Sequence, residues 1–209
     1  TNPIDDWTRQ ETGQKSVVVG KVSGEAGTTP ADSTTTASSK EVDALLEQMT
    51  LQEKIYQMFL VTPEAITGVD TVVQAGDATK AALQEQPVGG LIYFAANLET
   101  QSQTKEMLTT TQDYAKASSN GIGLWLAVDE EGGTVARVAD QLGTTAFSDM
   151  SVYGAENDST QAYSIGQTIG TDIHGLGFNL DFAPVADVDI CSENELGGRI
   201  FSDDPNVVA

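Results

Sequence analysis

Cysteine, histidine and basic residues are scarce in this chain of 209 residues. It has one cysteine and one histidine, and 10 lysines and arginines against 31 acidic residues. Cys191 has no partner for an internal disulfide, and no group of cysteine and histidine has the spacing of zinc ligands. We therefore expect Cys191 to be a buried structural thiol. The formal net charge of −21 repels phosphate backbones and anionic membrane surfaces, which argues against nucleic acid as a partner.

Long apolar runs are also missing. No stretch approaches the roughly 20 apolar residues that span a bilayer, so we expect no transmembrane segment. The N-terminus lacks a basic stretch followed by an apolar run, so no signal peptide is expected at its start. With 39% hydrophobic residues, the composition is typical of a soluble globular protein.

Residues 1–38 are rich in threonine, serine, glycine and aspartate and poor in apolar side chains. Because such a segment buries too little apolar surface to offset the entropy of ordering, we expect a flexible tether. Spacers of this composition often separate a membrane anchor or cell-wall signal from an enzyme domain. We therefore expect an extracytoplasmic protein of bacterial type, either secreted or tethered to the surface.

From residue 39 to residue 209, apolar runs alternate with amphipathic segments. Regular structure is expected to begin at Ser38, which has capping-box spacing to Glu41. Further helices are predicted from Thr50, before Pro87, from Thr100 and through Ile165, Ile169 and Ile173, where Gly166 and Gly170 indicate close helix packing. Strands are predicted at residues 58–61, 88–96, 124–128 and 180–186.

This alternation predicts an α/β fold with a parallel sheet covered by helices, either doubly wound or a (β/α)8 barrel. Four βα units are visible, and an eight-stranded barrel needs twice that number. If the fold is a TIM barrel, residues 39–209 form roughly its first half, and the C-terminal half of the barrel is missing.

Polar residues follow three of the predicted strands. Asn97 follows the second, Asp129 the third, and Asp187 and then Arg199 the fourth. In parallel α/β folds the ligand site lies beyond the carboxyl ends of the strands. Carboxylates and guanidinium groups at that edge suit a polyhydroxylated ligand, because each sugar hydroxyl both donates and accepts hydrogen bonds.

Asp129 carries the strongest of these signals, because paired glycines follow it and allow a tight turn near a ligand. A helix cap or loop carboxylate is an equal alternative on pattern alone. Arg137 suits either an ion pair with Asp129 or direct contact with ligand oxygens, and its alternative is an ordinary surface position.

Metal and nucleotide sites are not expected. Asp129, Glu130 and Glu131 are adjacent, so their side chains alternate between opposite sides of an extended segment and do not converge on a metal ion. The glycines at 175 and 177 precede a strand, contrary to the dinucleotide-binding pattern. The only histidine, His174, ends a predicted helix, where it complements the helix dipole. We expect neither a metal nor a cofactor.

Five segments together resemble glycoside hydrolase family 3. The specific ones are Val128-Asp-Glu-Glu-Gly-Gly-Thr-Val-Ala-Arg137, Gly177-Phe-Asn-Leu-Asp-Phe-Ala-Pro-Val-Ala-Asp-Val188 and Gly198-Arg-Ile-Phe-Ser-Asp-Asp-Pro205. Met49-Thr-Leu-Gln-Glu-Lys-Ile-Tyr-Gln-Met58 is similar to the opening helix of the family and Val88-Gly-Gly-Leu-Ile-Tyr-Phe94 to its second strand. The segments stand in family order. The Asp-x-Glu-Gly-Gly-x-Val-x-Arg pattern is similar to the β-N-acetylhexosaminidase branch.

The resemblance implies a (β/α)8 barrel that removes terminal β-linked N-acetylglucosamine from the non-reducing end of glycans, with retention of configuration. Peptidoglycan fragments and chitooligosaccharides are the substrates it suggests. By matching positions, Asp129, Arg137 and Arg199 would contact the terminal sugar. The nucleophile and the acid/base residue of this branch are expected beyond residue 209, so no catalytic residue is assigned here.

The phrase Phe201-Ser-Asp-Asp204 looks like the family's nucleophile segment, but it directly follows Arg199 and precedes Pro205. We interpret Asp204 as a helix N-cap with proline at the first helical position. Two alternatives remain open at this point: a carbohydrate-binding or structural protein that keeps the sugar-recognition residues without catalysis, and a doubly wound sheet of independent function.

Overall fold

The computed structural model describes residues 33–191 and 193–209, with side chains from residue 40 onward. Residues 1–32, which hold most of the predicted tether, lie outside the described residues. The chain divides into two units, Thr1–Val42 and Asp43–Ala209, and the second contains the sheet. Helix α1 (Ser33–Gln48) begins five residues before the predicted start, so Ser38 lies inside it and does not cap it. The prediction failed because serine and threonine cost only a few tenths of a kcal/mol in a helix.

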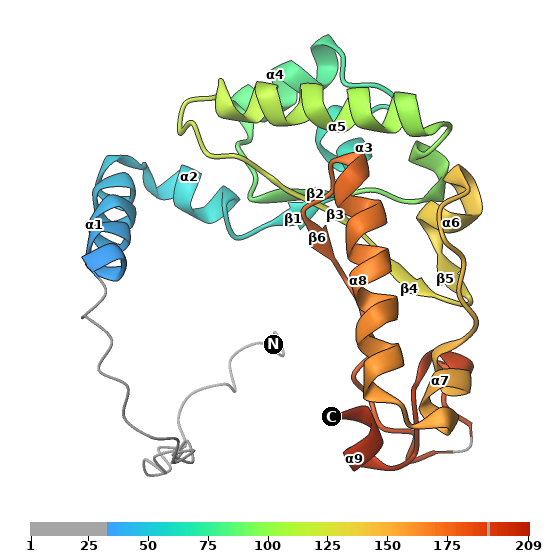
Figure 1. Ribbon diagram of the computed structural model, residues 1–209. Helices are drawn as coiled ribbons and strands as arrows, with labels where there is room; N and C mark the ends of the chain where they lie inside the picture. Colours follow the sequence, from blue (N-terminus) through green and yellow to red (C-terminus); the bar gives the residue numbers. More distant parts are fainter. Residues whose placement is uncertain (1–32, 192) are drawn as a thin grey trace, which may run out of the picture. The chain divides into compact units, whose positions relative to one another are not determined.

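A parallel four-stranded sheet is the centre of the second unit (Figure 1). Its strands are β1 (Leu60–Val61), β2 (Gly90–Ile92), β3 (Trp125–Val128) and β6 (Leu180–Asp181), in that spatial order. Leu91 is paired with Val61 and with Leu126 in the neighbouring strands. The four predicted strands and their parallel arrangement are confirmed, although each regular strand is shorter than its apolar run.

Helices connect these strands, as the sequence predicts. They are α3 (Pro63–Thr67), α4 (Asp77–Glu85), α5 (Gln101–Lys116) and α8 (Ser159–Leu176), and α2 (Leu51–Tyr56) precedes β1. The predicted capping box of Thr50 and Glu53 is formed, and the Thr100 side chain accepts a hydrogen bond from the Gln103 N–H. In the described part of the chain, no helix has both the length and the apolar character to cross a bilayer.

The hydrophobic core lies between the sheet and its helices. Leu91, Leu126 and Val128 are buried on the strands, and Leu108 and Ile169 are buried on α5 and α8. Gly166 and Gly170 of α8 have nothing within 4 Å of an added Cβ. The close helix packing predicted from these two glycines is therefore not seen among the described residues.

The segment after β3 also has regular structure. An antiparallel pair, β4 (Glu130–Gly132) and β5 (Val135–Ala136), leads into α6 (Arg137–Leu142) and then α7 (Met150–Glu156). The sequence did not predict this hairpin, because its short strands show no alternation of apolar and polar residues. Gly132 and Gly133 shape its turn, with φ values of 84° and 58°.

The segment after β6 holds η2 (Gly197–Arg199) and α9 (Pro205–Val208). The Asp204 side chain accepts a hydrogen bond from the Asn206 N–H, with Pro205 in the first turn, so the predicted N-cap is confirmed. His174 lies in the last turn of α8, also as predicted. The prediction for Cys191 is wrong: this thiol is exposed, because it follows the sheet on a loop rather than packing in the core.

Candidate functional site

Asp129 and Arg137 lie together at the carboxyl end of the sheet. Asp129 directly follows β3, and Arg137 begins α6. The Arg137 Nη2 and Nε donate to Asp129 Oδ2 at 3.0 and 3.3 Å. The guanidinium carbon also lies 4.9 Å from the centre of the Phe94 ring, just after β2. Both side chains of the pair remain partly exposed, at 29% for Arg137 and 21% for Asp129, so a ligand can reach them.

Arg199 forms a second ion pair, with Glu131. Its Nε donates to Oε2 at 2.7 Å and its Nη2 to Oε1 at 2.6 Å. The Glu131 side chain is only 6% exposed, whereas that of Arg199 is 29% exposed. The hydrogen bond to Glu131 raises the pKa of Arg199 above its ordinary value, and the charges of Asp129 and Asp187 add to this. Asp129 therefore interacts with both site arginines, with Arg137 through hydrogen bonds and with Arg199 through its charge.

Asp149 links the hairpin to the segment that carries Arg199. Its Oδ1 accepts hydrogen bonds from the N–H and the hydroxyl of Thr134, both at 2.9 Å. A Cβ on Gly133 would lie 2.6 Å from the Asp149 Cα, and a Cβ on Gly198 would lie 2.5 Å from its Oδ2. These two glycines thus allow Asp149 to sit between the hairpin turn and η2.

Two further carboxylates, those of Glu130 and Asp181, form hydrogen bonds to the backbone around the site residues. Glu130 is buried and accepts hydrogen bonds from the Val138 and Ala139 N–H groups at 2.5 and 3.1 Å. It thereby caps α6, the helix that begins with Arg137. Burial is the main reason that its pKa is raised.

Asp181 of β6 accepts a hydrogen bond from the Glu130 N–H at 2.9 Å. Burial raises the pKa of Asp181 to about 6, and the neighbouring carboxylates of Glu130, Asp129 and Glu131 add to this. Sequence reasoning did not single out Asp181. The available signal was an acid inside an otherwise apolar strand, where a charge needs a partner or a raised pKa.

Asn97 and Asp187, the other polar residues at this edge, have different roles. Asn97 is buried and structural: its Nδ2 donates to Glu64 Oε1 at 2.6 Å and to the Val72 carbonyl at 2.9 Å. Asp187 is exposed and acts on Arg199 through its charge. No cluster of three or more metal-ligating side chains occurs in the described ranges.

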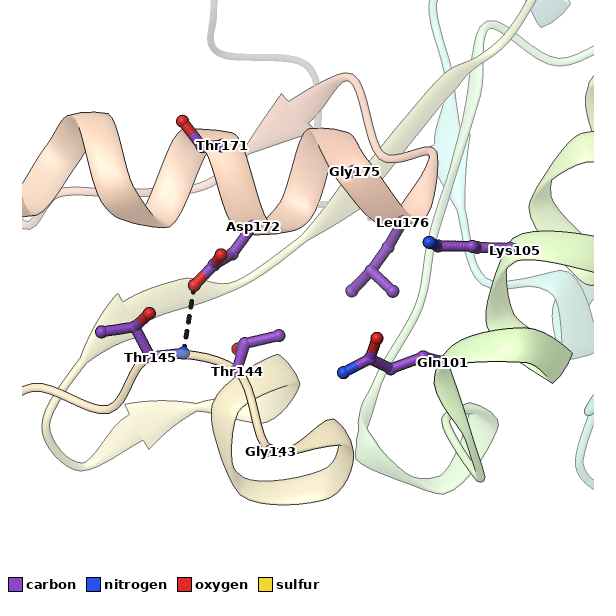
Figure 2. Close-up of a pocket in the computed structure, with 9 residues that line it drawn as sticks. All are labelled: Gln101, Lys105, Gly143, Thr144, Thr145, Thr171, Asp172, Gly175 and Leu176. Atoms are coloured by element: carbon purple, nitrogen blue, oxygen red, sulfur yellow. Dashed lines mark hydrogen bonds between the residues drawn. The ribbon is translucent and has the colours of Figure 1, made fainter.

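The cavities near these elements include two that border α8. One, of about 580 Å³, is bounded by Glu130, Glu131 and Asp181 together with one face of α8 and the end of α9. The other, of about 460 Å³, lies between the start of α5, the loop after α6 and the end of α8 (Figure 2). In it, Asp172 Oδ2 accepts a hydrogen bond from the Thr145 N–H at 3.0 Å. Neither cavity is lined by any of the three predicted site residues, Asp129, Arg137 and Arg199.

Comparison with known proteins identifies related sequences. The glycosyl hydrolase family 3 N-terminal domain matches residues 50–209. The beta-hexosaminidase A of Pseudoalteromonas piscicida is 34% identical over 125 residues, which are 58% of this chain and 21% of that protein. The beta-hexosaminidase of Bordetella avium is 34% identical over 142 residues, which are 65% of this chain and 39% of that protein.

Solved structures give the same result. A glycoside hydrolase family 3 beta-N-acetylglucosaminidase from Paenibacillus sp. matches with a TM-score of 0.67 and 30% identity, over 77% of this chain and 29% of that one. NagZ from Neisseria gonorrhoeae matches with a TM-score of 0.57 and 26% identity, over 71% and 41%.

The chain therefore spans 21 to 41% of the length of these four relatives. The predicted TIM-barrel type of α/β fold is confirmed, with part of the barrel present. Contact of Asp129, Arg137 and Arg199 with a sugar stays a prediction. The chain belongs to glycosyl hydrolase family 3, in its β-N-acetylhexosaminidase branch.

Proposed function

We propose that this domain binds the terminal β-linked N-acetylglucosamine of a glycan, and that the whole protein removes this sugar from the non-reducing end with retention of configuration. The observation that carries the proposal is the placement of Asp129, Arg137 and Arg199 after the third and fourth strands of the sheet. All three side chains are partly exposed, and Asp129 interacts electrostatically with both arginines. The relatives named above as beta-hexosaminidases and a beta-N-acetylglucosaminidase support it.

The chemistry of the three residues suits a sugar. Asp129 has a second carboxylate oxygen, Oδ1, for a sugar hydroxyl, because both of its bonds to Arg137 use Oδ2. The two arginines donate from planar groups of fixed geometry. Each charge-assisted hydrogen bond to the ligand contributes on the order of 1.5 to 3 kcal/mol. Peptidoglycan fragments and chitooligosaccharides are the substrates that we propose, and neither metal nor cofactor is required.

Retention of configuration requires a nucleophile and an acid/base residue. We assign neither within residues 1–209, so the chain should bind the sugar without hydrolysing its glycoside. The test is release of the leaving group from an aryl β-N-acetylglucosaminide, with saturation-transfer NMR on methyl N-acetyl-β-glucosaminide as the binding measurement. We expect binding and no release above background.

Release that disappears on changing Asp203 or Asp204 would make the Phe201–Asp204 segment catalytic and would contradict this assignment. Absence of binding would contradict the proposed site itself.

A carbohydrate-binding or structural role without catalysis is the second candidate. It is favoured by the presence of the recognition residues without an assigned nucleophile. The reading frame of the same gene after residue 209 separates the two functions. A Lys-His-x-Pro-Gly-like loop followed by a strand that ends in aspartate would support hydrolysis, and their absence would support binding alone.

We also propose an extracytoplasmic location, either secreted or tethered to the surface. The supporting observation is the threonine- and serine-rich composition of residues 1–38, which is typical of spacers. Fractionation of the source cells, followed by detection of the protein outside the cytoplasm, tests this proposal.

A further inference from the structure

We propose that Glu131 is a positioning residue that holds the Arg199 guanidinium in the orientation needed to bind the sugar. This inference rests on the proposed function, because it assigns Glu131 a task in sugar recognition that goes beyond the ion pair itself.

The geometry of the pair is a two-point contact. Arg199 donates from both Nε and Nη2, and each hydrogen bond goes to a different oxygen of Glu131, at 2.7 and 2.6 Å. Two parallel bonds between planar groups fix the plane of the guanidinium as well as its position. Arg137 differs, because both of its bonds go to one oxygen of Asp129.

Glu131 is itself held firmly. It lies in β4 with its side chain 6% exposed. The preceding residue, Glu130, is tied by its N–H to Asp181 and by its carboxylate to the first N–H groups of α6. These bonds fix the backbone of β4 directly before Glu131. The carboxylate therefore forms a fixed support for the arginine.

The backbone of Arg199 is anchored independently of this pair. Gly198 allows Asp149 to approach η2, and Gly154 of α7 allows the Phe201 carbonyl to approach that helix, because a Cβ on either glycine would overlap these atoms. Arg199 is thus fixed at its backbone by α7 and Asp149, and at its guanidinium by Glu131. Such preorganisation lowers the entropy lost on binding a ligand.

Arg199 still has hydrogens to offer. The two bonds to Glu131 use its Nε and one Nη2 hydrogen, and a guanidinium carries five N–H hydrogens. In the described part of the chain the others have no hydrogen-bond partner, and 29% of the side chain is exposed. One side of the group is thus bound to the protein while the rest is available to sugar oxygens.

The test is a double-mutant cycle on sugar affinity in the full chain. Glu131→Gln keeps the shape of the side chain but removes its charge and one acceptor oxygen. We expect it to weaken binding of methyl N-acetyl-β-glucosaminide about tenfold, equivalent to about 1.4 kcal/mol. Because Glu131 is proposed to act only through Arg199, Glu131→Gln should weaken binding no further in an Arg199→Ala background.

Two controls accompany the cycle. Asp172→Asn alters a carboxylate that also accepts a hydrogen bond, from the Thr145 N–H, but lies in the cavity of Figure 2. It should leave sugar affinity unchanged. The unfolding free energy of every variant is measured in denaturant, and the NMR signal of the Arg199 Nε–H should exchange faster in Glu131→Gln.

The outcomes separate this inference from the proposed function. Unchanged affinity in Glu131→Gln overturns the inference while the proposed function stands. So does an equal further loss of affinity in the Arg199→Ala background, because Glu131 would then act independently of the arginine. Absence of sugar binding by the unaltered chain overturns the proposed function, and this inference falls with it.

Discussion

At the scale of single residues, the two arginines of the site differ in how much stability they carry. Arg199 neutralises a carboxylate that is almost buried, whereas the partner of Arg137 is 21% exposed. A carboxylate that is left without a partner costs more free energy as its access to water decreases. The two arginines should therefore affect folding unequally, even if they affect sugar binding equally.

Alanine substitutions test this difference. Arg137→Ala should lower the free energy of unfolding by about 1 kcal/mol or less, and Arg199→Ala by about 1 to 3 kcal/mol. Leu126→Ala, a change in the core, should cost about 2 to 5 kcal/mol. Asp129→Ala, Arg137→Ala and Arg199→Ala should each weaken sugar binding at least tenfold, because each removes a charge-assisted hydrogen bond. Denaturant unfolding and saturation-transfer NMR give the two quantities.

Full sugar binding together with reduced stability in all three variants would show that these residues are structural ion pairs and that the sugar binds elsewhere.

The raised pKa of Asp181 predicts that the free energy of unfolding depends on pH. Its pKa is raised from 3.8 to about 6 in the folded chain, so the folded state binds its proton more tightly than the unfolded state does. The stability from this group is therefore fully present below about pH 4 and is lost as pH rises to about 6, by roughly 1 to 3 kcal/mol. Asp181→Asn should remove this loss. Unfolding free energies measured from pH 4 to pH 7 provide the test, and parallel curves for the two proteins would contradict it.

At the scale of elements, the position of η2 depends on how closely it packs against α7. A Cβ on Gly154 would overlap the Phe201 carbonyl, and η2 ends at Arg199, shortly before that residue. Gly154 thus allows η2, which carries Arg199, to lie close to α7, although glycine in a helix interior ordinarily costs stability.

Gly154→Ala should therefore destabilise the chain by about 1 to 3 kcal/mol, as overpacking typically does, and should weaken sugar binding by displacing Arg199. Gly166→Ala is the matched control in α8, where an added Cβ meets nothing within 4 Å. It should stabilise the chain by roughly 0.5 to 1 kcal/mol and leave binding unchanged. Equal effects of the two substitutions on the free energy of unfolding would show that the contact between α7 and the Phe201 segment does not position η2.

At the scale of the whole molecule, the sheet has two unpaired edges. Among the described residues β1 pairs only with β2, and β6 only with β3. Large apolar side chains are also exposed, among them Phe59, Trp125 and Phe182 at 52%, 57% and 48%. Unpaired edges and exposed apolar groups favour association.

We therefore expect the 209-residue chain to self-associate. Since each copy carries a formal charge of −21, repulsion should oppose association at low ionic strength, and added salt should promote it. Light scattering across a salt series measures the effect, and amide exchange reports protection of the sheet. Trp125→Thr, which keeps a strand-forming residue, should reduce association. A well-protected monomer at every salt concentration would show that the four βα units form a complete domain.

The sequence by itself determined the order and type of the main elements. Apolar runs and capping residues such as Thr50 and Asp204 are local signals, and the strands and helices that they predict are present. The sequence also placed Asp129 at the carboxyl end of the sheet, because residues that follow a parallel strand collect there, but it left open whether Arg137 pairs with Asp129. The family was evident from motifs for the same reason: they are continuous in the sequence.

Only the tertiary structure decided what each carboxylate does. Glu131 and Arg199 are 68 residues apart, and Asp181 reaches the backbone of Glu130 across 51 residues. The strand β4 escaped prediction because two of its three residues, Glu130 and Glu131, are charged, and their burial is possible only through these distant partners. A local sequence pattern shows which side chains are present in a segment. Their burial and pairing depend on distant segments that the fold brings together, so the residues that hold the site in place could not be predicted from the sequence.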